Sequence, residues 1–219
     1  MNTLENTAII IRGVTYDVNQ IKECFKDYSN NIIFSTWKGN ESKFKLEDKV
    51  VYSEQPVIDG PSSFILQRTT SLAGLEFASK LNYQNVILVR FDTFFKPANK
   101  VIELFNFNKL NFLCWHNHGI GYFVDYIMAG KIDHIKTLWS TFGVYPSDVS
   151  EHIITSNYAH KIPENVAVKF ILNDLNDECD IFWKKYNLML SKYQYHPPYN
   201  TMPNGIALED RKIFLNYIK

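Results

Sequence analysis

Short apolar runs separated by longer mixed stretches dominate the first part of the chain. Residues 7–12, 32–37 and 85–92 are mostly apolar or β-branched, and each run is too short for a helix. Such continuous runs are typical of strands buried on both faces. A shorter run at 49–53 predicts one more strand.

Helical spacing fills the intervals between these runs. Asp17 is a suitable N-cap for an apolar stripe over 18–28, and another helical stretch covers 63–81, just before the strand at 85–92. The resulting β-α-β order predicts an α/β fold with a mostly parallel central sheet.

The second half of the chain has a less regular pattern and predicts a helical C-terminal extension. Residues 170–193, acidic and then aromatic, are expected to be helical, before a loop and a short basic helix at the end. The other elements expected here are a helix at 97–105, a strand at 110–115, a loop at 116–121, a strand at 122–128, a turn at Ala129 and Gly130, a helix at 132–142, and a helix that begins at 146–148.

Composition limits the classes of partner. The chain has 219 residues, 46% of them hydrophobic, which is enough apolar surface for one large domain. Its 23 basic and 23 acidic residues balance, so a nucleic-acid partner is not expected. Three isolated cysteines, a polar N-terminus and the lack of an apolar run of about 20 residues predict a cytoplasmic protein without a transmembrane segment. Frequent Asn, Ile, Lys and Tyr suggest an A+T-rich genome, viral or bacterial.

The most informative charges stand at the end of the strand at 85–92. Arg90 and Asp92 are two residues apart and therefore share a face, at the carboxyl edge where open α/β sheets bind ligands. No glycine-rich dinucleotide fingerprint, P-loop or nucleophile elbow is present. A divalent cation, Mg²⁺ or Mn²⁺, on Asp92 would be another way to hold a phosphate. The alternative is an ion pair that simply closes the strand.

Four further residues are candidates for chemistry, each with a structural alternative. His116 and His118 could ligate a metal, although contact with a substrate or phosphate is favoured. Asp125 lies within an apolar strand, where it needs a partner and is either functional or structural. Glu151 lies near a helix start, which by itself favours an acidic residue.

A set of short motifs resembles the WavE-like glycosyltransferases of lipopolysaccharide and viral glycan synthesis. The resemblance covers about residues 8–160. Its motifs are Ile33-Phe-Ser-Thr-Trp-Lys-Gly39, Asp59-Gly60, Gln67-x-x-Thr70-Ser71-x-x-Gly74-Leu75 and Arg90-x-Asp92.

The resemblance implies a GT-A-type αβα sandwich, with a nucleotide-binding half over about 1–95 and an acceptor-binding half over about 96–219. In that family two acids at a strand end hold Mn²⁺ or Mg²⁺ against the donor diphosphate. Arg90 stands in place of the first acid, so only Asp92 carries over as a metal contact. The residues expected near the donor are Arg12, Gly13, Tyr16, Thr36, Trp37, Asp59, Gln67, Arg68, Ser71, Arg90, His116 and His118.

The implied reaction is transfer of a hexosyl or deoxyhexosyl group from a UDP- or GDP-sugar to a glycan or lipopolysaccharide-type acceptor. If the anomeric centre inverts, a carboxylate must accept the acceptor proton, and Asp125 and Glu151 are the candidates. Two other functions stay open. One is a non-catalytic nucleotide-sugar or glycan-binding module. The other is a sugar-phosphate nucleotidyltransferase, which the segment after the first strand does not favour.

Overall fold

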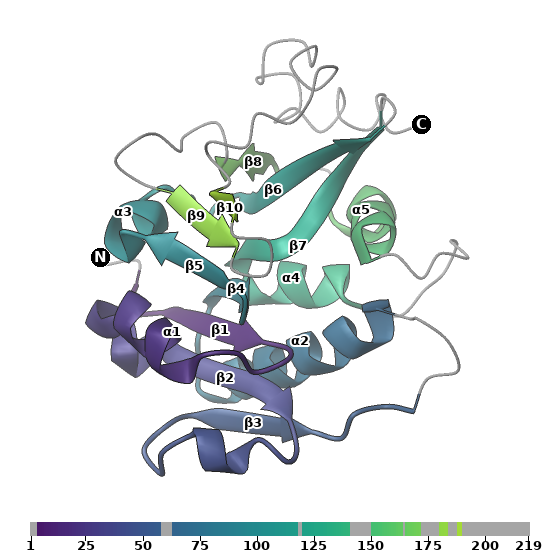
Figure 1. Ribbon diagram of the computed structural model, residues 1–219. Helices are drawn as coiled ribbons and strands as arrows, with labels where there is room; N and C mark the ends of the chain where they lie inside the picture. The colour runs from purple at the N-terminus through teal and green to yellow at the C-terminus, as the bar shows by residue number, and fades with distance from the viewer. Residues whose placement is uncertain are drawn as a thin grey trace.

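A seven-stranded sheet forms the centre of the computed structural model (Figure 1). The structure describes residues 4–57, 63–117, 120–140, 150–163, 165–171, 180–183 and 188–189. The sheet has the order β3-β2-β1-β4-β7-β6-β8. Its strands are β1 (Thr7–Arg12), β2 (Ile32–Trp37), β3 (Val50–Ser53), β4 (Asn85–Arg90), β6 (Leu110–Asn117), β7 (Ile120–Lys131) and β8 (Val168–Phe170).

Six of these strands run in one direction. β1 pairs in parallel with β2 and β4, β2 with β3, and β6 with β8. β7 is antiparallel to both of its neighbours, β4 and β6. The predicted mostly parallel sheet is therefore confirmed.

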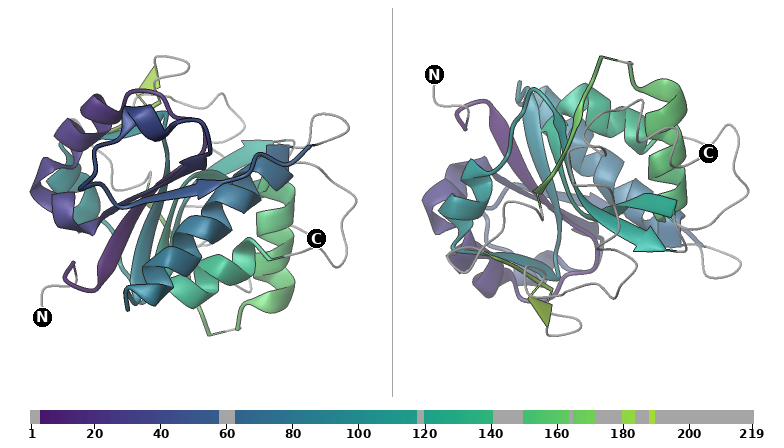
Figure 2. Two further views of the ribbon diagram at one scale, coloured as in Figure 1. Left: turned by 90° about the horizontal axis from the view of Figure 1, so that it is seen from below. Right: turned by 90° about the horizontal axis from the view of Figure 1, so that it is seen from above.

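Helices cover both faces of the sheet, which gives the expected αβα sandwich (Figures 1 and 2). Alternate residues of β1 enter opposite layers. Ile9 and Ile11 pack in the cluster that contains α1 and α3, and Ala8 and Ile10 pack in the cluster that contains α2, α4 and α5. The helices are α1 (Val18–Cys24), α2 (Ser63–Lys80), α3 (Ala98–Glu103), α4 (Ile132–Leu138) and α5 (Ser150–Lys161), with 3₁₀ turns η1 (Lys26–Asn31) and η2 (Glu41–Lys43).

Helix α1 begins as predicted and ends earlier than predicted. The Asp17 carboxylate accepts a hydrogen bond from the backbone N–H of Gln20, at 2.9 Å, and so caps the helix. The helix stops at Cys24 because Phe25 leaves helical geometry, and the 3₁₀ turn η1 follows.

A second, three-stranded sheet corrects one prediction. Its order is β10-β9-β5, and it consists of β5 (Thr93–Lys96), β9 (Asp180–Trp183) and β10 (Leu188–Met189). The segment 170–193 was expected to be helical, and its described parts at 180–183 and 188–189 are strands. The ring of Phe95 lies 5.1 Å from that of Phe25, so β5 belongs to the layer of α1 and α3.

The predicted turn at Ala129 and Gly130 is also wrong, because β7 continues through both residues to Lys131. A Cβ atom on Gly130 would lie 3.0 Å from Leu110 Cδ2 and 3.3 Å from the Lys109 carbonyl oxygen. Glycine in this strand therefore marks a close approach of a neighbouring segment.

Candidate functional site

The carboxyl ends of three adjacent strands surround a cleft of about 370 Å³. The strands are β1, β2 and β4, which end at Arg12, Trp37 and Arg90. This is the edge at which open α/β sheets bind ligands. The described residues that line the cleft are Arg12, Gly13, Val14, Tyr16, Trp37, Gln55, Leu66, Gln67, Arg90, Phe91 and Asp92.

The turn after β1 forms one wall of this cleft. Gly13 has a φ of +101°, a conformation that favours glycine, and its backbone N–H donates to the Ser35 carbonyl at 3.0 Å. The Thr36 hydroxyl donates to the Gly13 carbonyl at 2.9 Å and lies 2.8 Å from the Thr15 hydroxyl. Buried Thr36 thus fixes the turn by hydrogen bonds from the protein interior. Tyr16, on the same turn, is 46% exposed.

Arg90 and Asp92 are joined by two parallel hydrogen bonds. Nε of Arg90 donates to Oδ1 of Asp92 at 3.0 Å, and Nη2 donates to Oδ2 at 2.9 Å. The expected placement of the two side chains side by side is confirmed. The Asp92 side chain is 3% exposed, and that of Arg90 is 21% exposed. The Arg90 side chain is therefore the more exposed of the two.

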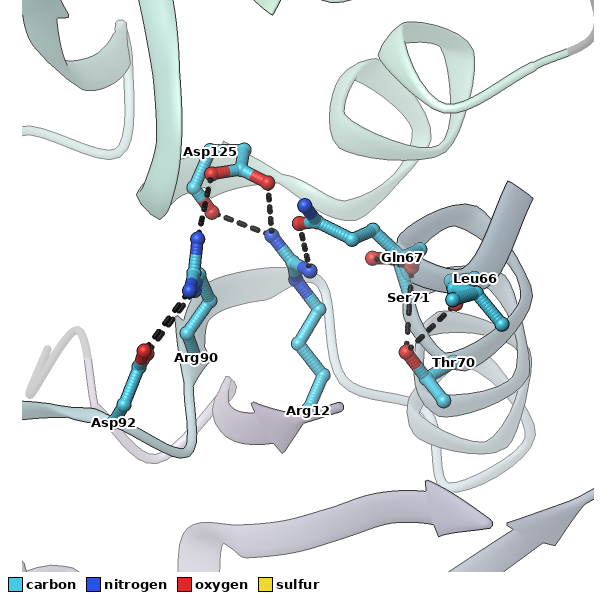
Figure 3. A network of polar contacts seen from close by, with 8 residues as sticks. All are labelled: Arg12, Leu66, Gln67, Thr70, Ser71, Arg90, Asp92 and Asp125. Carbon is cyan, nitrogen blue, oxygen red and sulfur yellow. Dashed lines mark hydrogen bonds and ion pairs between the residues drawn. The ribbon is translucent and has the colours of Figure 1, made fainter. Parts of the chain in front are cut away.

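Asp125 reaches this pair from β7. Its Oδ1 lies 3.4 Å from Arg90 Nη1, and its Oδ2 lies 3.5 Å from Arg12 Nη2 (Figure 3). Arg12 Nη2 also donates to the Asp125 backbone carbonyl at 2.5 Å. The pairing of β6 with β7 jumps from Phe112–Met128 to Leu113–Val124, so Asp125 lies in an irregular stretch of β7. Such irregularities re-aim side chains, here toward the strand ends.

Arg12 forms the floor of the cleft and is almost fully buried. Its Nη1 donates to Oε1 of Gln67, on α2, at 2.7 Å, and its Cζ lies 4.7 Å from the centre of the Trp139 ring. Burial lowers the pKa of Arg12 to about 10, although Asp125 opposes that change. Burial also lowers the pKa of Arg90, but the charges of Asp125 and Asp92 outweigh it and the net change is upward.

The structure places the remaining sequence candidates in three groups. Arg68 and Ser71 lie on α2 but do not line the cleft: Arg68 Nε donates to the Trp139 carbonyl at 2.9 Å, and the Ser71 hydroxyl donates to the Gln67 carbonyl at 2.6 Å. Asp59 and His118 lie outside the described residues. For His116 in β6 and Glu151 in α5, only the backbone is described.

Sequence reasoning missed several residues of this site. Val14, Gln55 and Leu66 line the cleft, and the rings of Tyr126 and Trp139 lie against the two guanidinium groups. The position of Val14, directly after Gly13 in the turn that follows β1, was an available signal. No local pattern links the two rings to Arg90 and Arg12.

The described residues do not fit the Mn²⁺ or Mg²⁺ ion expected on Asp92. Asp92 is the one acidic residue among the described residues of the cleft, and both of its oxygens accept hydrogen bonds from Arg90. Within the part of the chain that the structure describes, no three His, Cys, Asp or Glu residues are grouped as metal ligands. Divalent cations prefer several oxygen ligands, and the adjacent guanidinium charge opposes a second cation.

Comparison with solved structures gives distant likenesses, and one of them is to a glycosyltransferase. The crystal structure of a glycosyltransferase involved in the glycosylation of the major capsid of PBCV-1 is similar over 76% of this chain and 83% of that chain. The identity is 13% and the TM-score is 0.47, values at which the likeness assigns no activity to this chain. No family model and no curated protein matches. The resemblance to WavE-like glycosyltransferases stays a prediction. None of the described helices is both long and apolar enough to cross a membrane.

Proposed function

We propose that this chain is a glycosyltransferase that takes a sugar from a nucleoside diphosphate sugar and transfers it to a glycan acceptor. The observation that carries the proposal is the cleft at the ends of β1, β2 and β4, which the partly exposed side chain of Arg90 lines. A planar guanidinium matches the geometry of phosphate oxygens. The Arg90-x-Asp92 strand end and the other motifs resemble those of WavE-like glycosyltransferases, and this resemblance supports the same assignment.

The size and lining of the cleft suit a nucleotide sugar. Its volume of about 370 Å³ lies within the range of small-molecule sites. Tyr16 and Trp37 offer aromatic surface at the side of β1 and β2, and Arg90 offers charge at the end of β4. We infer that the base lies against the aromatic side chains and the diphosphate lies near Arg90.

The proposed reaction breaks the bond between the anomeric carbon and the diphosphate oxygen and forms a bond from that carbon to an acceptor oxygen. The electron pair of the broken bond leaves with the nucleoside diphosphate, whose growing negative charge Arg90 stabilises. The acceptor proton passes to a base. Glu151 stays a candidate for that role.

Asp125 has a different role in this proposal. Its side chain is fully buried and lies against Arg12 and Arg90, so it does not face an acceptor in the cleft. We therefore propose Asp125 as a positioning residue that orients both guanidinium groups, in place of the general base that the sequence suggested.

The proposal is tested by incubating the protein with UDP-, GDP-, dTDP- and CMP-sugars and measuring both melting temperature and released nucleotide. A bound donor raises the melting temperature by mass action. We expect one class of donor to raise it and to yield the nucleotide product with a glycan acceptor. Binding without any release would favour the glycan- or nucleotide-sugar-binding module. Formation of pyrophosphate from a nucleoside triphosphate and a sugar phosphate would favour the nucleotidyltransferase.

Two exposed valines provide matched variants for locating the donor. Val14 is 64% exposed and lines the cleft, whereas Val57 is 99% exposed and does not. Val14→Trp should fill the cleft and abolish the donor-induced rise in melting temperature. Val57→Trp should leave it unchanged. Equal responses of the two variants would place the donor elsewhere.

A further inference from the structure

We propose that this site binds the donor diphosphate without a divalent cation, and that the guanidinium of Arg90 supplies the positive charge that a metal ion would otherwise provide. This inference rests on the proposed function, since it concerns how the same cleft holds a nucleoside diphosphate. Three observations carry it: the fixed position of Arg90, the engagement of Asp92, and the charge balance of the site.

Arg90 is held in one orientation before any ligand arrives. Asp92 accepts two hydrogen bonds from it at 3.0 and 2.9 Å, Asp125 lies 3.4 Å from its Nη1, and the Tyr126 ring lies 4.8 Å from its Cζ. The accessible part of the side chain borders the cleft. A guanidinium fixed in this way loses little conformational entropy when it binds a phosphate.

Asp92 is poorly placed to hold a metal ion. An ion about 2.1 Å from Oδ2, a normal distance for Mg²⁺, would lie within about 5 Å of Arg90 Nη2, which is itself 2.9 Å from that oxygen. Two positive charges at that separation repel each other, and the effect grows in a partly buried site. Among the described residues of the cleft, the Gln67 amide oxygen is not available as a further ligand, because it already accepts a hydrogen bond from Arg12.

The site contains two guanidinium groups and two carboxylates, which balance in charge but differ in burial. The side chains of Arg12, Asp92 and Asp125 are at most 3% exposed. Two carboxylates and one guanidinium are therefore almost fully buried, and Arg90, whose side chain is 21% exposed and lines the cleft, is the most exposed charge of the four. An anion that enters the cleft therefore meets the positive charge of Arg90 first. The carboxylates of Asp92 and Asp125 keep the Arg90 guanidinium protonated and oriented.

The wild-type protein provides the first test. The affinity for the nucleoside diphosphate selected in the donor screen is measured by calorimetry in EDTA, in Mg²⁺ and in Mn²⁺, and Mn²⁺ binding is followed separately by electron paramagnetic resonance. We expect the three dissociation constants to agree within a factor of about two, well below the tenfold change that corresponds to about 1.4 kcal/mol, and we expect free Mn²⁺ throughout. Binding only in the presence of a cation would overturn the inference and leave the proposed function intact. A lack of binding under every condition would overturn the proposed function itself.

A matched pair of variants tests the role of Arg90. Arg90→Gln removes the charge and should weaken binding in EDTA by roughly 10- to 100-fold, the range for losing a hydrogen bond to a charged group. Lys22→Gln is the control, because Lys22 is also a partly exposed cation in an ion pair, with Asp48 at 2.5 Å, but lies outside the cleft. Circular dichroism checks that both variants fold. Equal affinities of the two variants would contradict the inference, and the wild-type cation series decides it if Arg90→Gln does not fold.

Discussion

The carboxylate of Asp125 lies 3.5 Å from the guanidinium of Arg12, although 113 residues separate them in the sequence. Arg12 ends β1 and Asp125 belongs to β7, and β4 lies between these strands in the sheet. Neither side chain has more than 1% of its surface exposed. This buried pair therefore joins the first half of the sheet to the β6–β7 hairpin directly beneath the candidate site.

We predict that Asp125→Asn destabilises the fold strongly. The change leaves the charge of Arg12 buried without its counterion, which typically costs about 3–5 kcal/mol. Chemical denaturation should show this as a lower free energy of unfolding. Asp133→Asn is the control, because Asp133 is exposed in the first turn of α4, and it should cost no more than about 1 kcal/mol. Similar losses in both variants would contradict the buried pair.

A double variant separates the effect of charge from the effect of packing at Arg12 and Asp125. Arg12→Met combined with Asp125→Leu removes both charges and keeps apolar volume. It should be more stable than Asp125→Asn alone, because no unpaired charge remains in the interior. If the double variant is instead as unstable as the sum of its single changes, the two residues are not coupled.

We predict that Gly74→Ala destabilises the contact between α2 and the sheet. A Cβ atom there would lie 2.6 Å from Ile10 Cγ2 and 3.0 Å from Ser35 Cβ. Overpacking of this kind costs about 1–3 kcal/mol, and a contact this short belongs at the upper end of that range. Alanine recovers only about 1 kcal/mol through its helix propensity. A net loss of about 2 kcal/mol in thermal or chemical unfolding is expected.

The origin of that loss can be tested by relieving the contact. In Ile10→Ala/Gly74→Ala the new methyl group has space, so the double variant should be more stable than the sum of the single variants by more than about 0.5 kcal/mol. Strict additivity would indicate that Ile10 is not the residue that Gly74 accommodates.

Local sequence patterns were sufficient to predict the β1 and β2 strands and the helix cap that form one side of the site. The continuous apolar runs of β1 and β2 and the cap at Asp17 were predicted from neighbouring residues alone. The contact between Arg90 and Asp92 was also predictable, because a spacing of two along an extended chain places both side chains on one face.

The side of the site that β7 contributes depends on pairing between strands that are distant in the sequence, which no local pattern predicts. Asp125 reaches Arg12 and Arg90 because β7 departs from regular pairing with β6 around it. Residues 180–183 were expected to be helical, but they pair with β5 as a strand, since tertiary pairing overrides weak local preference. The sequence predicts a turn at Gly130, but this glycine lies within β7, where it leaves space for Leu110.

We predict that the thiol of Cys24 reacts slowly in the folded protein. Its Sγ donates to the Phe95 carbonyl at 3.1 Å and accepts from the Phe95 N–H at 3.3 Å, and burial raises its pKa to about 11. Relative to an ordinary thiol with a pKa near 9, about 100-fold less thiolate is present at pH 8. Alkylation followed by peptide mass spectrometry should show Cys24 labelled that much more slowly in the native chain than in denaturant.

The raised pKa of Cys24 also predicts how the free energy of unfolding changes with pH. The folded state favours the neutral thiol, so the contribution of Cys24 is complete below the pKa of the unfolded chain, near 9, and is lost as the pH rises toward about 11. Cys24→Ala should remove this part of the decline in stability between pH 9 and 11. An unchanged pH profile in that variant would show that Cys24 is not its source.

We predict that Tyr16 provides stacking surface for the nucleotide base. Its side chain is 46% exposed on the turn after β1 and lines the cleft, so a ligand has access to it. Stacking of a base on an aromatic ring contributes about 1–3 kcal/mol. Tyr16→Ala should therefore weaken nucleotide binding by roughly 10- to 100-fold in calorimetry. Tyr16→Phe keeps the ring and should bind like the wild type, whereas Leu46→Ala removes an exposed side chain outside the cleft and should have no effect. If Tyr16→Phe binds as weakly as Tyr16→Ala, the hydroxyl group and not the ring carries the interaction.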